Sequence, residues 1–179
     1  RRIEKDYQAE KEAAEQREQA MENLETETVW VYEQLHEIAI RLAASISYYF
    51  LNTGVPTRMI CNGSDCITDQ VAVIPTGSGL RHVNAIAEVL ARIDLTRTVV
   101  SCTDQLHELT NKMANSTSAP LYIMISNSMS NSLQDAFEQL IKTGSSAMWI
   151  APLYEDMELR VRKIPNMDII RWEVNKYEN

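Results

Sequence analysis

The sequence predicts an α/β protein in which a mainly parallel sheet carries helices on both faces. One observation is the stretch Val71–Asp94, VAVIPTGSGLRHVNAIAEVLARID, where a short apolar run meets a glycine-containing turn and an amphipathic helix follows at once. Another is the run Leu121–Ser126, LYIMIS, whose successive apolar residues are typical of a strand buried on both faces. Predicted helices alternate with these apolar runs along the chain. Right-handed crossover connections between parallel strands would place the helices on both faces of the sheet, which gives a three-layer, Rossmann-like domain.

The composition is that of a globular protein whose charge disfavours nucleic acid. The chain has 179 residues, 45% of them hydrophobic, and a formal net charge of −8. Binding to nucleic acid needs lysine and arginine to neutralise phosphates, so we expect no such partner. No stretch offers the ~18 continuous apolar residues of a membrane span. Cys61, Cys66 and Cys102 lack the paired spacing of a zinc site, and we expect free thiols in a reducing cytoplasm.

We expect two parts, a helical segment over residues 1–24 and an α/β domain over residues 25–179. The segment is rich in Glu, Gln, Ala and Lys and has neither Gly nor Pro, so its helix propensity is high. The domain should begin with a long core helix, Val31–Leu51, and Gly54 is suited to the left-handed position that ends it. A hairpin or an edge strand follows, because turn-forming residues separate two short apolar runs. These runs are Thr57–Cys61 and Gln70–Ile74.

Beyond the opening stretch, helices and strands alternate. The helix after the PTGSG turn should bury the face that carries Leu80, Val83, Ala87, Leu90 and Ala91. The β-branched run Thr98–Ser101 is either a strand or the lead-in to a helix over Asp104–Met113 that Thr103 caps. Leu121–Ser126 should be central in the sheet. The last elements are a helix, a buried strand and a short strand, at Ser132–Lys142, Ala147–Ala151 and Asp168–Val174. This last strand either adds an edge to the sheet or lies across it.

The turn formed by Thr76, Gly77, Ser78 and Gly79 is a candidate anion site. Its glycines let the backbone approach a ligand, and the N–H groups that begin the next helix point outward. The Gly-Lys-Ser/Thr of a phosphate-binding Walker loop is absent. The alternative, which we favour, is a strand-to-helix turn whose glycines serve geometry and whose Ser78 caps the helix.

Polar residues also follow the LYIMIS run, at the position where open α/β sheets bind ligands. The oxygens of Asn127, Ser128 and Ser130 could hold a hard cation, but no carboxylate lies among them, so capping of the next helix is the favoured interpretation. The three histidines lie on predicted helices, and none adjoins a nucleophile motif. The sequence therefore predicts no catalytic residue.

Three runs together resemble one bacterial family: AIRLAASISYYFLNTGVPTRMICNG, VIPTGSGLRHVNAIAEVLARIDL and PLYIMISNSMSNSLQDAFEQLIKTGSSAMWIAP. Over about Glu25–Val174 the chain is similar to the C-terminal half of the domain-of-unknown-function family fifty-eight, which carries a von Willebrand factor A-like (vWA-like) domain. Members usually have N-terminal membrane helices and are often encoded beside MoxR-type AAA+ ATPases. The resemblance implies a domain at the cytosolic face of a membrane-associated protein, with an assembly or chaperone-like role beside the ATPase.

The resemblance also implies a place for a divalent ion such as Mg²⁺. A vWA domain holds the ion with an Asp-x-Ser-x-Ser turn, a threonine of a second loop and an aspartate after a later strand. The corresponding positions here are Glu25, Thr76 or Ser78, and Asn127. Because Glu25 and Asn127 stand where the family has aspartates, a vWA scaffold without metal is favoured.

Two functional hypotheses follow. The first is a non-enzymatic protein-interaction module that presents the carboxyl ends of its strands to a protein partner. The second is an enzyme that binds phosphate or a nucleotide at the PTGSG turn.

The first strand of a vWA-like sheet is not visible before Glu25, so we expect that the N-terminal helical segment belongs to a preceding part of the protein, or that this strand is truncated.

Overall fold

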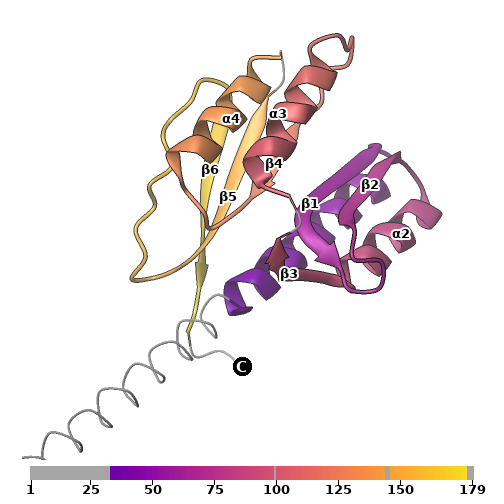
Figure 1. Cartoon of the computed structure of the whole chain (residues 1–179), viewed down its shortest axis with the longest axis horizontal. Coiled ribbons are helices and arrows are strands. Elements are labelled where there is room, and N and C mark those ends of the chain that lie inside the picture. The colour runs from indigo at the N-terminus through magenta and orange to yellow at the C-terminus, as the bar shows by residue number, and fades with distance from the viewer. Residues whose placement is uncertain (1–32, 99, 144–145, 177–179) are drawn as a thin grey trace, which may run out of the picture. The chain divides into compact units, whose positions relative to one another are not determined.

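The described part of the chain has an α/β fold with two three-stranded sheets (Figure 1). The computed structural model describes residues 33–98, 100–143 and 146–176. The chain divides into two units, Arg1–Gln34 and Leu35–Asn179, and nearly all described residues belong to the second. One mainly parallel sheet was expected, but within the described residues one sheet is antiparallel and the other parallel.

The antiparallel sheet is built on the hairpin that the sequence predicts. β1 (Thr57–Asp65) pairs with β2 (Val71–Gly77) and with β3 (Ile93–Thr98), in the order β2-β1-β3. Strands joined by so short a connection can pair only antiparallel, which explains why they do not join a parallel sheet. β3 ends at Thr98, the first residue of the run Thr98–Ser101 that suggested a strand.

The hairpin turns at Asp65, one of the predicted turn formers, and not at Asn62-Gly63. Asn62 and Gly63 continue β1, and the chain turns after Asp65 instead. The Asp65 carboxylate accepts hydrogen bonds from the N–H groups of Ile67 at 2.9 Å and Thr68 at 3.3 Å. Arg92 also pairs with this carboxylate at 3.0 Å. These contacts fix the turn from a buried position, and they lower the pKa of Asp65, chiefly through the Ile67 hydrogen bond.

Helices cover one face of the antiparallel sheet. The helix over residues 33–52 ends as expected, with Gly54 at φ 82°. The second helix, α2 (Leu80–Leu90), buries Ile86 and Leu90. The predicted face was partly wrong, because Leu80, Ala87 and Ala91 are exposed. Turning the helix toward Ile86 rather than Ala87 buries more apolar surface, which is the more stable arrangement.

The parallel sheet has the order β4-β5-β6, from β4 (Tyr122–Ile125), β5 (Ala147–Tyr154) and β6 (Met167–Val174). The expectation that the LYIMIS run is central was therefore wrong within the described residues, because β4 is an edge strand. β5 is the central strand and is almost completely buried. β6 adds the other edge, which is one of the two arrangements expected for it.

Two helices pack on one face of this parallel sheet, α3 (Cys102–Met113) and α4 (Asn131–Ile141) (Figure 1). The centre of their core is Trp149, whose ring meets Phe137 edge to face at 5.5 Å. The buried indole N–H donates to the carbonyl of Ser126 at 3.2 Å, so this donor keeps a hydrogen-bond partner inside the core. The N-cap of α3 is Ser101 rather than the predicted Thr103. No helix in the described part of the chain combines the length and apolarity that crossing a membrane requires.

Candidate functional site

The PTGSG turn is shorter than its sequence suggests. Pro75, Thr76 and Gly77 continue β2, so only Ser78 and Gly79 connect the strand to α2. Gly79 is the N-cap, at φ 78° and ψ 179°, a conformation that residues with a side chain rarely adopt. The predicted cap by Ser78 was wrong, because α2 has no side-chain cap hydrogen bond. The glycine is required by the geometry of the turn.

His82 fixes this turn to the neighbouring strand. Its Nε2 lies 2.7 Å from the carbonyl oxygen of Thr57, and since a carbonyl can only accept, Nε2–H is the donor. The imidazole lies directly against Gly77, where an added Cβ would come within 2.4 Å of Nδ1. The sequence predicted that His82 lies on a helix but indicated no role for its side chain. Its function in the fold is to hold the start of α2 against the hairpin.

The surface around the turn is exposed and partly apolar. Thr76, Ser78 and Gly79 are all exposed, and Leu80 is 75% exposed at the first position of α2. Val55 is 46% exposed, two residues before Thr57. Thr57 pairs with Gly77, which brings the two segments together at this end of the sheet. We call the group Val55, Thr76, Ser78, Gly79 and Leu80 the turn surface.

The polar loop after β4 caps the next helix, which is the interpretation that the sequence favoured over a cation site. Ser130 is the N-cap of α4 and accepts a hydrogen bond from the N–H of Leu133 at 3.4 Å. Ser128 N–H donates to the hydroxyl of Ser126 at 3.1 Å, within the same loop. Asn127 is half-buried. The hydroxyl groups of Ser126 and Ser130 therefore accept local backbone hydrogen bonds in this loop.

Sequence reasoning missed a buried glutamine that supports this loop. Gln134 is 1% exposed, and its Nε2 donates to the carbonyl of Met129 at 2.7 Å. The same amide nitrogen donates to the carbonyl of Arg160 at 3.3 Å, and its Oε1 accepts from the N–H of Arg162 at 2.8 Å. A polar residue on the predicted apolar face of a helix was the signal that could have identified it.

The candidate metal residues belong to different sheets. Thr76 and Ser78 lie at the end of β2 in the antiparallel sheet, whereas Asn127 follows β4 in the parallel sheet. Glu25 lies outside the described residues. Over residues 33–98, 100–143 and 146–176, no three or more His, Cys, Asp or Glu side chains group as metal ligands would.

The thiols differ in exposure. Burial raises the pKa of Cys61 and raises the pKa of Cys102 to about 11, so both stay protonated at neutral pH. Cys66 is exposed in the hairpin turn. All three are free, and two have the environment of structural rather than nucleophilic cysteines.

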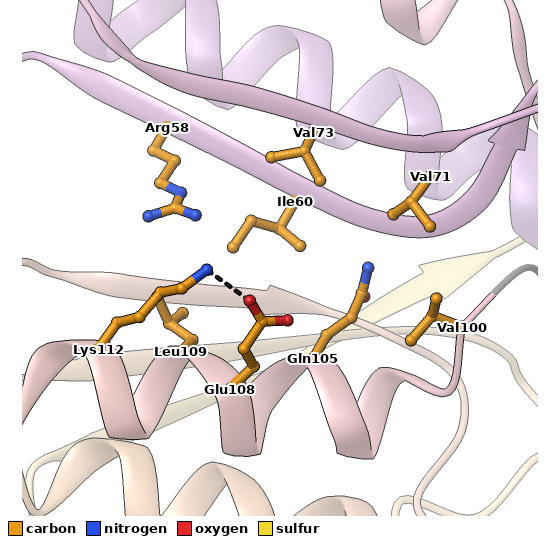
Figure 2. Close-up of a pocket in the computed structure, with 9 residues that line it drawn as sticks. All are labelled: Arg58, Ile60, Val71, Val73, Val100, Gln105, Glu108, Leu109 and Lys112. Atoms are coloured by element: carbon orange, nitrogen blue, oxygen red, sulfur yellow. Dashed lines mark hydrogen bonds and ion pairs between the residues drawn. The ribbon is translucent and has the colours of Figure 1, made fainter. Parts of the chain in front are cut away.

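A cleft of about 210 Å³ lies between the antiparallel sheet and α3 (Figure 2). On one side, the cleft is lined by the face of the antiparallel sheet that points away from α2. The register partners Ile60 and Val73 lie on this face. Their neighbours Met59 and Ile74 lie on the other face, in the core under α2. Sequence periodicity did not identify this cleft, because one wall comes from β1 and β2 and the other from Val100 and α3, which are far apart in the chain.

Searches against protein-family models, curated proteins and solved structures find no match to the chain.

Proposed function

We propose that the chain is a non-enzymatic protein-interaction module whose partner contacts the turn surface. The observation that carries the proposal is the 75% exposure of Leu80, a large apolar side chain beside exposed Thr76, Ser78 and Gly79. An apolar anchor within a polar rim is the usual composition of a binding surface. Val55 adds a second exposed apolar side chain at the same end of the sheet.

The turn surface is also held in one conformation before any partner arrives. The His82–Thr57 hydrogen bond and the contact of the imidazole with Gly77 fix the start of α2 to the hairpin. A surface that is already ordered loses less conformational entropy when it binds, which favours affinity. Gly79, constrained at positive φ, contributes to the same order.

The partner is a MoxR-type AAA+ ATPase in this proposal, and the domain is vWA-like with a three-layer arrangement. The support is the resemblance of the three runs to the domain-of-unknown-function family fifty-eight. A parallel sheet with α3 and α4 on one face is compatible with it. In the parent protein the module works at the cytosolic face of the membrane, in assembly or chaperone-like work.

The test is binding of the purified chain to the MoxR-type ATPase of the source cell, measured by biolayer interferometry. Leu80→Ser should weaken binding about tenfold, as expected when an apolar anchor at an interface is removed. Leu121→Ser is the matched control, because Leu121 is also exposed, at 46%, but precedes β4. Absence of wild-type binding, or equal losses in the two variants, would contradict the proposal.

A second candidate function, binding of a phosphate or nucleotide at the PTGSG turn, has one observation in its favour. The first turn of α2 contains no acidic residue and carries Arg81, and no side chain caps its N–H groups. Positive charge at a helix start favours anions. Calorimetric titration with ATP, ADP and inorganic phosphate, with and without Mg²⁺, distinguishes the two functions: saturable nucleotide binding that Arg81→Met weakens supports this second candidate.

A further inference from the structure

The cleft between the antiparallel sheet and α3 has an apolar end and a charged end. Figure 2 shows the side chains of β1 and β2 pointing toward those of α3 across it. Val71 and Val100 line the apolar end, and Ile60 and Val73 extend this lining along the sheet. Val73 is 44% exposed, so a large apolar side chain faces the cleft without being covered. An uncovered apolar wall favours a ligand with an apolar chain.

The two ends are fixed by contacts of α3. Gln105 donates from Nε2 to the carbonyl of Cys61 at 3.2 Å, which ties the helix to β1 near the apolar end. At the other end Lys112 pairs with Glu108 at 2.5 Å. Leu106, between them in sequence, is buried in the core on the opposite side of α3. The helix therefore presents a polar stripe to the cleft while its apolar stripe holds it in place.

The charged end has a net positive charge. Arg58 enters it from β1. None of the ion pairs between described residues includes its guanidinium. The hydrogen bond and charge of Lys112 hold the pKa of Glu108 below its usual range, and the charge of Arg58 adds to this effect. Glu108 is therefore ionised at neutral pH and neutralises one of the two cations. One positive charge is left for a monoanion, and Glu108 would repel a more highly charged group.

We propose that this cleft binds a small aliphatic monocarboxylate, with its carboxylate at Arg58 and its chain along Ile60 and Val73. The cleft volume of about 210 Å³ is below the size of a drug-like site. A chain of about eight carbons suits this space. Arginine is the preferred side chain for a carboxylate because its planar N–H groups match both oxygens.

The test is methyl NMR of the full chain, titrated with octanoate, octan-1-ol and octylamine. Octanoate should give saturable shifts at the methyl groups of Ile60, Val73 and Leu109, with weaker binding of the alcohol and weakest binding of the amine. Arg58→Met should weaken octanoate binding about fivefold, the size expected for an exposed ion pair, and leave the alcohol unchanged. Arg41→Met, at an exposed arginine on the helix over residues 33–52, is the matched control and should change nothing.

A second variant tests the apolar part of the site without depending on Arg58. Val73→Trp places a larger side chain in the cleft from a position that is already partly exposed, and it should abolish saturation by octanoate while the rest of the spectrum is preserved. The proposal is overturned if octylamine or octan-1-ol binds as tightly as octanoate, if the shifts lie outside the cleft, or if Arg58→Met has no effect. The turn surface is not involved, so this outcome is independent of binding to the ATPase.

Discussion

Substitution of Gly77 tests the role of His82 most directly. Gly77 lies in β2 outside the left-handed region, so alanine suits its backbone. The new Cβ would nevertheless lie 2.4 Å from Nδ1, 2.7 Å from Cε1 and 2.9 Å from Cγ of His82. Because Cγ is not the far end of a flexible side chain, the whole imidazole must move, and the 2.7 Å hydrogen bond to Thr57 is lost.

The expected cost follows from three contributions. Loss of the hydrogen bond costs ~1 kcal/mol, and displacement of the packed ring costs ~1 kcal/mol or more. Replacing glycine restricts the unfolded chain and returns about 0.4–1 kcal/mol. Gly77→Ala should therefore lower the free energy of unfolding by about 1–2 kcal/mol, measured by urea denaturation of the full chain.

A double-mutant cycle isolates the contact. His82→Ala alone should cost ~1 kcal/mol through the lost hydrogen bond. In the His82→Ala background, Gly77→Ala meets no ring and should be neutral or slightly stabilising. If Gly77→Ala costs the same in both backgrounds, or nothing in either, the imidazole is not what makes glycine necessary at this position.

Three further predictions concern other parts of the fold. Trp149→Phe should lower the free energy of unfolding by ~2 kcal/mol, because it removes a buried hydrogen bond and apolar volume; a loss below about 0.5 kcal/mol in urea denaturation would contradict the assigned packing. Asp65→Asn should destabilise the protein at pH 7, and because the pKa of Asp65 is lowered in the folded state, the difference from wild type should diminish as pH falls below ~4; a difference independent of pH would exclude the ionic contribution. Iodoacetamide at pH 7.5 should label Cys66 at least tenfold faster than Cys102, as followed by mass spectrometry, and similar rates would contradict the burial of Cys102.

Several elements could be predicted because their signals are local. The end of the first helix at Gly54, the cap of α4 at Ser130 and the strand beginning at Ala147 each depend on a few neighbouring residues. The hairpin was also predicted correctly as a pairing. Of the turn-forming residues, Asp65 was assigned correctly, whereas Asn62-Gly63 continues the strand because a local turn signal does not report the pairing of β1 with its neighbours.

The arrangement of strands could not be predicted because it depends on contacts far apart in sequence. The composition of Tyr122–Ile125 is that of a central strand, yet the longer Ala147–Tyr154 has the central position among the described strands. Periodicity reports which residues are apolar and cannot report which strand pairs with which. The candidate site was limited for the same reason: the partner of His82 is 25 residues away, and Gln105 reaches 44 residues back to Cys61.

The buried Gln134 has a consequence for how the molecule opens. The segment 155–166 has no helix or strand of its own, and part of its backbone is bonded instead to this one side chain of α4. Releasing the segment would leave a buried amide without its partners, which makes separate opening costly. The segment and α4 therefore open together as one cooperative unit. The backbone amides of this irregular segment are then protected from hydrogen exchange to the same degree as those of the helix.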